Sequence, residues 1–135
     1  MRKLVVLAFA LLVSTLGAQA QEALQPQTQN GITFTSGGIG SEGRDALRQV
    51  QGSYNLKLMF AVQGSGDYLS DVKIKVMDGH GATLLDAVSE GPYFLAQLKP
   101  GTYKIVADSA GRAQTRTVSI DKGTAAASFY WPTGG

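Results

Sequence analysis

The chain has 135 residues and a formal net charge of +2, with 17 glycines, one histidine and no cysteine. This length is enough for one domain. The lack of cysteine excludes disulfides, thiolate zinc sites and cysteine nucleophiles, and a single histidine excludes a histidine-rich metal cluster.

The first 20 residues have the pattern of a secretory signal peptide. Arg2 and Lys3 precede an apolar run, residues 4–16, which is shorter than the ~20 residues of a membrane-spanning helix. The small-x-small sequence Ala-Gln-Ala at 18–20 then provides a cleavage site. We therefore expect export to the periplasm or the medium, with residues 1–20 removed.

Cleavage would leave a chain without net charge. Without Arg2 and Lys3, ten basic residues balance the ten acidic ones, and no stripe of basic residues remains. Binding to nucleic acid or to an anionic membrane surface depends on such a stripe. We therefore expect neither partner after cleavage.

The segment before residue 55 is predicted to hold a leader, a loop and one helix. Residues 21–30 are polar and rich in glutamine, which indicates a disordered leader. Residues 31–54 begin with a short β-prone piece at 32–35 and then form a glycine-rich loop. Ser41 is the expected N-cap of a short helix, and Gly52 lies just beyond its expected end.

Residues 55–132 change to the alternating apolar and polar pattern of half-buried strands. Turn sequences rich in glycine, proline and aspartate separate the apolar segments. The helix is thus followed by seven predicted strands, at 56–62, 72–77, 83–88, 93–98, 102–108, 113–120 and 124–131. This pattern predicts an all-β protein, a seven-stranded antiparallel β-sandwich with one short N-terminal helix.

Residues 91–103, Gly-Pro-Tyr-Phe-Leu-Ala-Gln-Leu-Lys-Pro-Gly-Thr-Tyr, resemble the signature of carboxypeptidase regulatory-like domains. In that family a leucine, a Pro-Gly turn and a tyrosine precede a strand of a transthyretin-like (prealbumin-like) β-sandwich. The resemblance covers roughly residues 56–131. The glycine-rich loop and helix also resemble small exported proteobacterial proteins that carry this domain. The resemblance implies a prealbumin-like fold over 55–132 and a non-catalytic module.

Four residues are expected to have structural roles. Pro100 and Gly101 predict a type II turn, and Tyr103 begins the following strand on its inward face. Trp131 alternates with Phe129 and is also predicted to point into the core.

No pattern in the sequence indicates catalysis, a metal or a cofactor. His80 stands alone in a glycine-flanked turn, so neither a metal site nor a Ser-His-Asp triad can be assembled around it. The aspartates at 67, 71 and 78 do not have the spacing of an EF-hand loop. The glycine-rich sequence at 37–41 lacks the lysine of a phosphate-binding loop, so we interpret it as a bend of the chain.

The remaining candidates are aromatic. Tyr68, Tyr93 and Tyr130 are a candidate ligand surface, since flat rings match the apolar faces of sugars and peptides. The sequence thus predicts an exported binding or accessory module whose partner is a protein, a peptide or a glycan. Two alternatives stay open: a carbohydrate- or peptide-binding module that uses exposed tyrosines, and a structural subunit that pairs through an edge strand.

Overall fold

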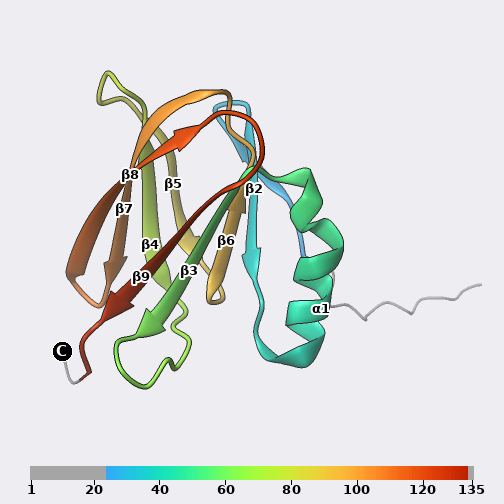
Figure 1. Cartoon of the computed structure of the whole chain (residues 1–135), viewed down its shortest axis with the longest axis vertical. Coiled ribbons are helices and arrows are strands. Elements are labelled where there is room, and N and C mark those ends of the chain that lie inside the picture. Colours follow the sequence, from blue (N-terminus) through green and yellow to red (C-terminus); the bar gives the residue numbers. More distant parts are fainter. Residues whose placement is uncertain (1–23, 134–135) are drawn as a thin grey trace, which may run out of the picture.

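The structure, a computed structural model, describes residues 24–133 as two packed β-sheets with a helix beside one of them (Figure 1). One sheet has the strand order β1-β2-β6-β3-β9 and the other β5-β4-β7-β8. The strands are β1 (Gln27–Gln29), β2 (Ile32–Gly37), β3 (Leu56–Val62), β4 (Val72–Met77), β5 (Thr83–Ser89), β6 (Tyr93–Ala96), β7 (Gly101–Ser109), β8 (Arg112–Ile120) and β9 (Ala125–Trp131). Helix α1 (Gly40–Val50) continues into the 3-10 turn η2 (Gln51–Ser53).

The predicted β-sandwich with one short helix is confirmed, but it has nine strands and not seven. Seven strands follow the helix, as the alternation predicts, and β1 and β2 precede it. The expected disordered leader at 21–30 is wrong for Gln27–Gln29, because these residues pair with β2. The predicted signal segment, residues 1–20, lies outside the described residues. Within 24–133 no helix is long and apolar enough to cross a membrane.

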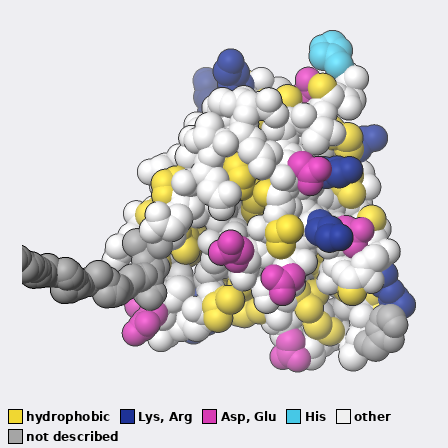
Figure 2. Space-filling model, turned by 180° about the vertical axis from the view of Figure 1, so that it is seen from behind, with side chains coloured by type: hydrophobic (Ala, Val, Ile, Leu, Met, Phe, Trp, Pro, Cys, Tyr) yellow, Lys and Arg dark blue, Asp and Glu magenta, His cyan; other side chains and the backbone are white. Residues whose placement is uncertain are grey.

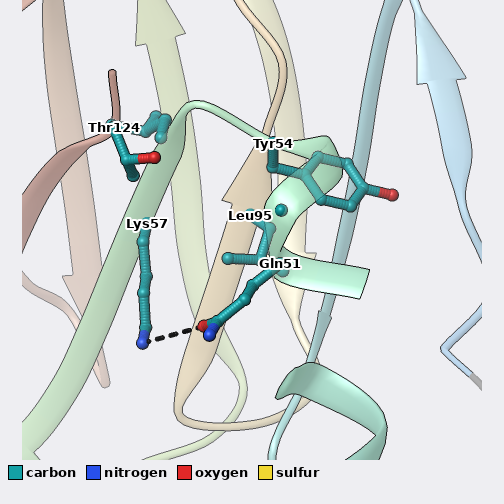
Figure 3. Close-up of a pocket in the computed structure, with 7 residues that line it drawn as sticks. Gln51, Tyr54, Lys57, Leu95 and Thr124 are labelled. Atoms are coloured by element: carbon teal, nitrogen blue, oxygen red, sulfur yellow. Dashed lines mark hydrogen bonds between the residues drawn. The ribbon is translucent and has the colours of Figure 1, made fainter. Parts of the chain in front are cut away.

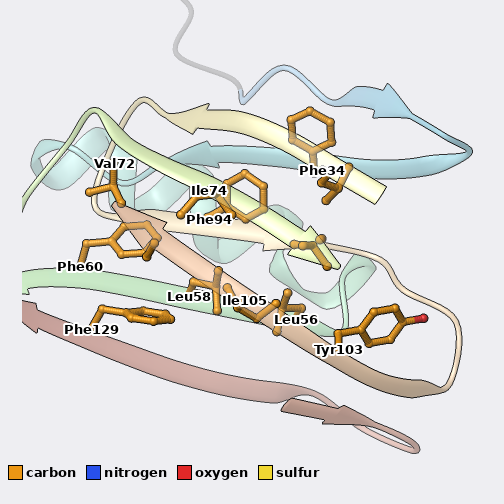
Figure 4. Close-up of a cluster of buried hydrophobic side chains, with 14 of the residues drawn as sticks. Phe34, Leu56, Leu58, Phe60, Val72, Ile74, Phe94, Tyr103, Ile105 and Phe129 are labelled. Atoms are coloured by element: carbon orange, nitrogen blue, oxygen red, sulfur yellow. The ribbon is translucent and has the colours of Figure 1, made fainter. Parts of the chain in front are cut away.

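The core fills the space between the two sheets (Figure 4). Alternate residues of β3 and β4 point into it and are fully buried, as the period of two predicts. Phe60 and Phe129 contact each other there, with ring centroids 5.8 Å apart. The largest fully buried side chains of this core are Phe60, Phe94, Phe129, Leu56, Leu58, Ile74, Leu85 and Ile105.

The expectation of a wholly antiparallel sandwich is wrong at one position. Strand β9 runs parallel to β3, from Leu56 opposite Ala125 to Val62 opposite Trp131. The chain reaches β9 from β8, which belongs to the other sheet. Since β9 is reached by this crossing and not through a hairpin, no tight turn forces it to oppose the direction of β3.

Side chains bond to the outer edges of both sheets. On one side, Gln29 Nε2 donates to the Asp86 carbonyl (3.1 Å) and Gln29 Oε1 accepts from the Asp86 N–H (2.9 Å). On the other side, Gln114 donates to the Tyr130 carbonyl (2.6 Å) and Arg116 to the Ser128 carbonyl (2.7 Å). These bonds occupy backbone groups of β5 and β9 that would otherwise be free for pairing with another strand.

Helix α1 begins without the predicted cap. Its N-cap residue is Ile39, and no side-chain hydrogen bond caps the helix, so the assignment of Ser41 is wrong. The helix thus begins two residues earlier than a cap at Ser41 would place it, and Gly40 at its start has a φ of +71°, which glycine adopts without strain. At the other end, Gly52 belongs to η2 and does not have a positive φ. The chain thus tightens into a 3-10 turn and does not end in the expected left-handed residue.

The residues expected to be structural lie at the two ends of the sandwich. The Tyr103 side chain is in the core, 8% exposed, and its hydroxyl donates to the Lys99 carbonyl at 2.7 Å. Trp131 is 4% exposed, and its Nε1 donates to the Arg112 carbonyl at 2.8 Å. Gly101 follows Pro100 with a φ of +157°, far from the ~+80° of a type II turn, so that turn type is wrong.

Replacement of Tyr103 tests its structural role. Tyr103→Ala should lower the free energy of unfolding by about 3–5 kcal/mol, because it removes a buried ring. Tyr103→Phe should lose only about 1 kcal/mol, the contribution of one hydrogen bond. Denaturant unfolding measures both changes. Tyr68→Ala, at a half-exposed ring, is the control and should stay within about 0.5 kcal/mol of wild type; a Tyr103→Ala protein as stable as this control would contradict the assignment.

Candidate ligand-binding face

Strand β3 brings the three candidate tyrosines to one face of the molecule. Its core-facing residues alternate with Met59 and Ala61, which point away from the core. Tyr93 on β6 pairs with Met59, and Tyr130 on β9 pairs with Ala61. Tyr68, from the segment after β3, forms an isolated bridge with Ala61. We call the outer side of β3, β6 and β9 that carries Tyr68, Tyr93 and Tyr130 the tyrosine face.

The tyrosine face is aromatic and accessible. Tyr68 and Tyr130 are 50% and 45% exposed, among the most exposed large hydrophobic residues in the described part of the chain. The rings of Tyr68 and Tyr93 have centroids 5.8 Å apart at 57°, and the Tyr93 hydroxyl donates to the Tyr68 hydroxyl at 3.3 Å. Ala61, paired with both Tyr68 and Tyr130, is 1% exposed although it points away from the core. The small residue therefore lies beneath the aromatic layer.

Helix α1 and η2 cover the neighbouring part of the same sheet. Leu47 of the helix packs with Leu95 of β6 and with Tyr54, and all three are buried. Figure 1 shows the helix beside β2, while β3 and β9 are left uncovered by it. The helix therefore sets one border of the tyrosine face.

The glycine-rich loop lets this border approach Tyr93. A Cβ atom on Gly38 would lie 2.5 Å from Cδ2 of Tyr93, and one on Gly43 would lie 3.1 Å from the Gly38 carbonyl carbon. Gly38 also has a φ of +98°, which side chains disfavour. The loop thus bends the chain onto the sandwich, and the edge of the Tyr93 ring packs against its backbone.

Lys57 lines two neighbouring hollows, and Tyr93 lines the second of them. The first, about 350 Å³, lies below η2 and is lined by Gln51, Gly52, Tyr54, Leu56, Lys57, Leu95 and Thr124 (Figure 3). The second, about 290 Å³, lies on the tyrosine face and is lined by Lys57, Met59, Tyr93, Ala126, Ala127 and Ser128. Lys57 Nζ donates to Gln51 Oε1 at 3.3 Å and lies 5.1 Å from the Tyr93 ring centroid. The ammonium group is therefore held between the two hollows.

Hydrogen bonding and burial change the acidity of Tyr93. The bond to Tyr68 and partial burial raise the pKa of Tyr93 from the ordinary 10.0 to about 12, and the charge of Arg44 opposes this shift. Tyr93 is therefore neutral at physiological pH, and its hydroxyl can act as a donor and an acceptor.

The other candidates of the sequence lie elsewhere. His80 is exposed in the β4–β5 turn, where the Asp78 carboxylate accepts the N–H groups of Ala82 (3.0 Å) and His80 (2.8 Å). These two bonds lower the pKa of Asp78. Among residues 24–133, no three metal-ligating side chains come together. The aspartate thus organises the turn.

The opposite side of the molecule has a different chemistry. Figure 2 shows basic and acidic side chains interspersed on the face turned away in Figure 1. In the β4 register, Lys75 lies opposite Asp86 of β5, and Lys73 lies opposite Asp108 of β7. Such cross-strand pairs of opposite charge are typical of a solvated sheet surface.

Sequence reasoning missed Lys57 and Gln51. Lys57 occupies an ordinary polar position in the alternation of β3, and Gln51 follows the helix without a motif. A usable signal was that Lys57 is the only charged residue of β3. Its neighbours across the sheet, however, cannot be read from the chain.

Comparison of the chain with models of known protein families and with curated protein sequences finds no match. The resemblance of residues 56–131 to carboxypeptidase regulatory-like domains therefore stays a prediction.

The bond between the tyrosines can be tested by titration. In wild type, Tyr93 should ionise near pH 12, and Tyr68→Phe should move its pKa toward 10, because the acceptor of its hydroxyl proton is lost. NMR shifts of the labelled tyrosine rings report each titration. Since the folded pKa lies above the unfolded one, the stabilisation from this group should be complete below pH 10 and disappear as the pH rises toward 12. Tyr130→Phe should have the smaller effect; equal effects would contradict the assignment.

Proposed function

We propose that the protein is a non-catalytic binding module and that its tyrosine face binds a glycan chain. The observation that carries this proposal is that three tyrosines from separate parts of the sequence share one exposed surface. A single half-exposed tyrosine is ordinary, whereas several of them gathered on one surface form an aromatic patch. Here Tyr68 and Tyr130 are about half exposed, and no described part of the chain covers them further.

The chemistry of the face suits sugars. An aromatic ring offers a flat apolar surface to the C–H groups on one side of a pyranose ring. The hydroxyls of Tyr68, Tyr93 and Ser128 can exchange hydrogen bonds with sugar hydroxyls. Because the surface is open along β3 and β9, it supports binding along an extended chain better than enclosure of a small molecule.

The two other partner classes have less support. A peptide that extends the sheet, or a second subunit that does so, needs free backbone groups at a sheet edge. Gln29 occupies the backbone of Asp86 on β5, and Gln114 and Arg116 occupy carbonyls of β9. Pairing of another strand with β5 or β9 would first have to break these bonds.

Export and the family assignment belong to the same proposal. The pattern of residues 1–20 supports secretion into the periplasm or the medium, where polysaccharides are accessible. The Pro-Gly-Thr-Tyr sequence at 100–103 supports a carboxypeptidase regulatory-like, prealbumin-like domain. Such a domain would serve as an accessory module without a cofactor.

Affinity electrophoresis through gels with embedded bacterial and plant polysaccharides tests the proposal. At least one polysaccharide should retard wild type. Tyr68→Ala and Tyr130→Ala should each weaken that binding about fivefold, because each removes a stacking contact of about 1 kcal/mol.

Val88→Ala is the matched control for this experiment. Val88 is also a large exposed hydrophobic residue, 49% exposed, but it lies on β5 of the other sheet. Its replacement should leave retardation unchanged. The proposal is wrong if no polysaccharide retards the protein, or if Val88→Ala weakens binding as much as the tyrosine variants.

A further inference from the structure

We propose that the glycan is acidic and that Lys57 recognises the carboxylate of a uronate residue. This inference rests on the proposed glycan function of the tyrosine face. It comes from a charge that the fold leaves without a counterion at one end of the aromatic surface, next to Tyr93.

Lys57 has no acidic neighbour in the sheet that carries it. Its register partners are Leu95 on β6 and Ala126 on β9, both apolar. Lys104 on the other sheet also lacks an acidic register partner, but its side chain is exposed. Lys57, by contrast, is half-buried beside the Tyr93 ring.

The groups that do hold Lys57 are neutral. Its Nζ atom donates to Gln51 Oε1 and lies over the Tyr93 ring. In residues 24–133 the single ion pair joins Arg48 to Asp45 and does not include Lys57. A cation–π contact and an amide fix the position of the ammonium without neutralising its charge. The half-buried lysine is therefore oriented in advance for an anion.

The position of Lys57 matches a sugar that lies on the rings. Lys57 and Met59 are successive outward residues of β3, about 7 Å apart along the strand, and Met59 is paired with Tyr93. A sugar residue bound beside Tyr93 would thus have its exocyclic group next to the ammonium. The half-buried Arg44 also acts on Tyr93, because its charge lowers the pKa of that hydroxyl. Both cations favour a carboxylate over a neutral hydroxymethyl group at this place.

Oligosaccharides that differ only in their acidic group test whether the protein recognises the carboxylate or only the sugar ring. The probes are β-1,4-linked mannuronate and β-1,4-linked mannose oligomers of equal length, together with the α-1,4-linked galacturonate and galactose pair. Within each pair only C6 differs, as a carboxylate or a hydroxymethyl group. Calorimetry with the full chain should give at least tenfold tighter binding of a uronate than of its neutral counterpart, the ratio expected for one charge-assisted hydrogen bond.

Variants assign this preference to one side chain. Lys57→Met keeps the apolar stem and should reduce uronate affinity to that of the neutral oligomer, while Lys57→Arg should retain most of the preference. Lys75→Met, which removes an exposed lysine from the other sheet, should change nothing. Thermal melting checks that each variant is folded. High salt should weaken uronate binding in wild type but not in Lys57→Met.

Three outcomes would contradict the uronate assignment, and they have different consequences for glycan binding. Equal affinity for acidic and neutral oligomers, lost in Tyr68→Ala but unchanged in Lys57→Met, would overturn the uronate assignment and leave glycan binding intact. Absence of binding to all four oligomers would overturn the uronate assignment, whereas the polysaccharide gels decide glycan binding separately. Tight binding of polyaspartate that depends on Lys57 but not on Tyr68 or Tyr130 would show that the site takes acidic peptides, and would also overturn the assignment.

Discussion

The register of β3 is the constraint on which the tyrosine face depends. Met59 and Ala61 pair with Tyr93, Tyr68 and Tyr130, which come from three separate segments of the chain. The same alternation buries Leu56, Leu58 and Phe60 completely. A slip of one residue would exchange the two sides of the strand, which would turn a charged Lys57 into the core. The hydrophobic core and the candidate binding surface are therefore fixed together.

A second constraint decides which part of the sheet stays open. Leu47 and Tyr54 bury the outer side of β6 at Leu95, and the contact depends on close approach of backbone segments. A Cβ atom on Gly91 would lie 2.5 Å from the Gly37 carbonyl oxygen, and one on Gly38 would meet the Tyr93 ring. These glycines let the helix and its loop pack at the border of the aromatic surface without covering β3 and β9. The helix thus limits the face and positions Tyr93 within it.

Local patterns in the sequence predict strands and faces, but not partners. Alternation and turn residues are sufficient to predict the seven strands after the helix. The aromatic side chains of Tyr68, Tyr93 and Tyr130 are sufficient to suggest a ligand surface. The parallel pairing of β3 with β9 has no local signal, since it joins segments about 70 residues apart. Strand β1 was missed because its sequence is polar, and its attachment includes bonds from the amide of Gln29 to the backbone of Asp86. The apolar surroundings of Lys57 cannot be predicted from the sequence either, because Leu95 and Ala126 become its neighbours only when the sheet forms.

The sealed edges explain why recognition is expected on a face. A sandwich with free edges can recruit a strand from any peptide, with little dependence on side chains. Here the Arg116 guanidinium bonds to the Ser128 carbonyl and lies 5.1 Å from the centroid of the Phe129 ring, so it closes the β8–β9 edge and covers an aromatic ring of the core. The Arg116 side chain therefore has a structural role. Lys57 is also held by neutral groups, through a longer bond of 3.3 Å to Gln51 and a contact with the Tyr93 ring. The two cations differ in place: Arg116 closes an edge, whereas Lys57 lies next to rings that the solvent reaches, and this position is the physical basis for assigning recognition to the tyrosine face.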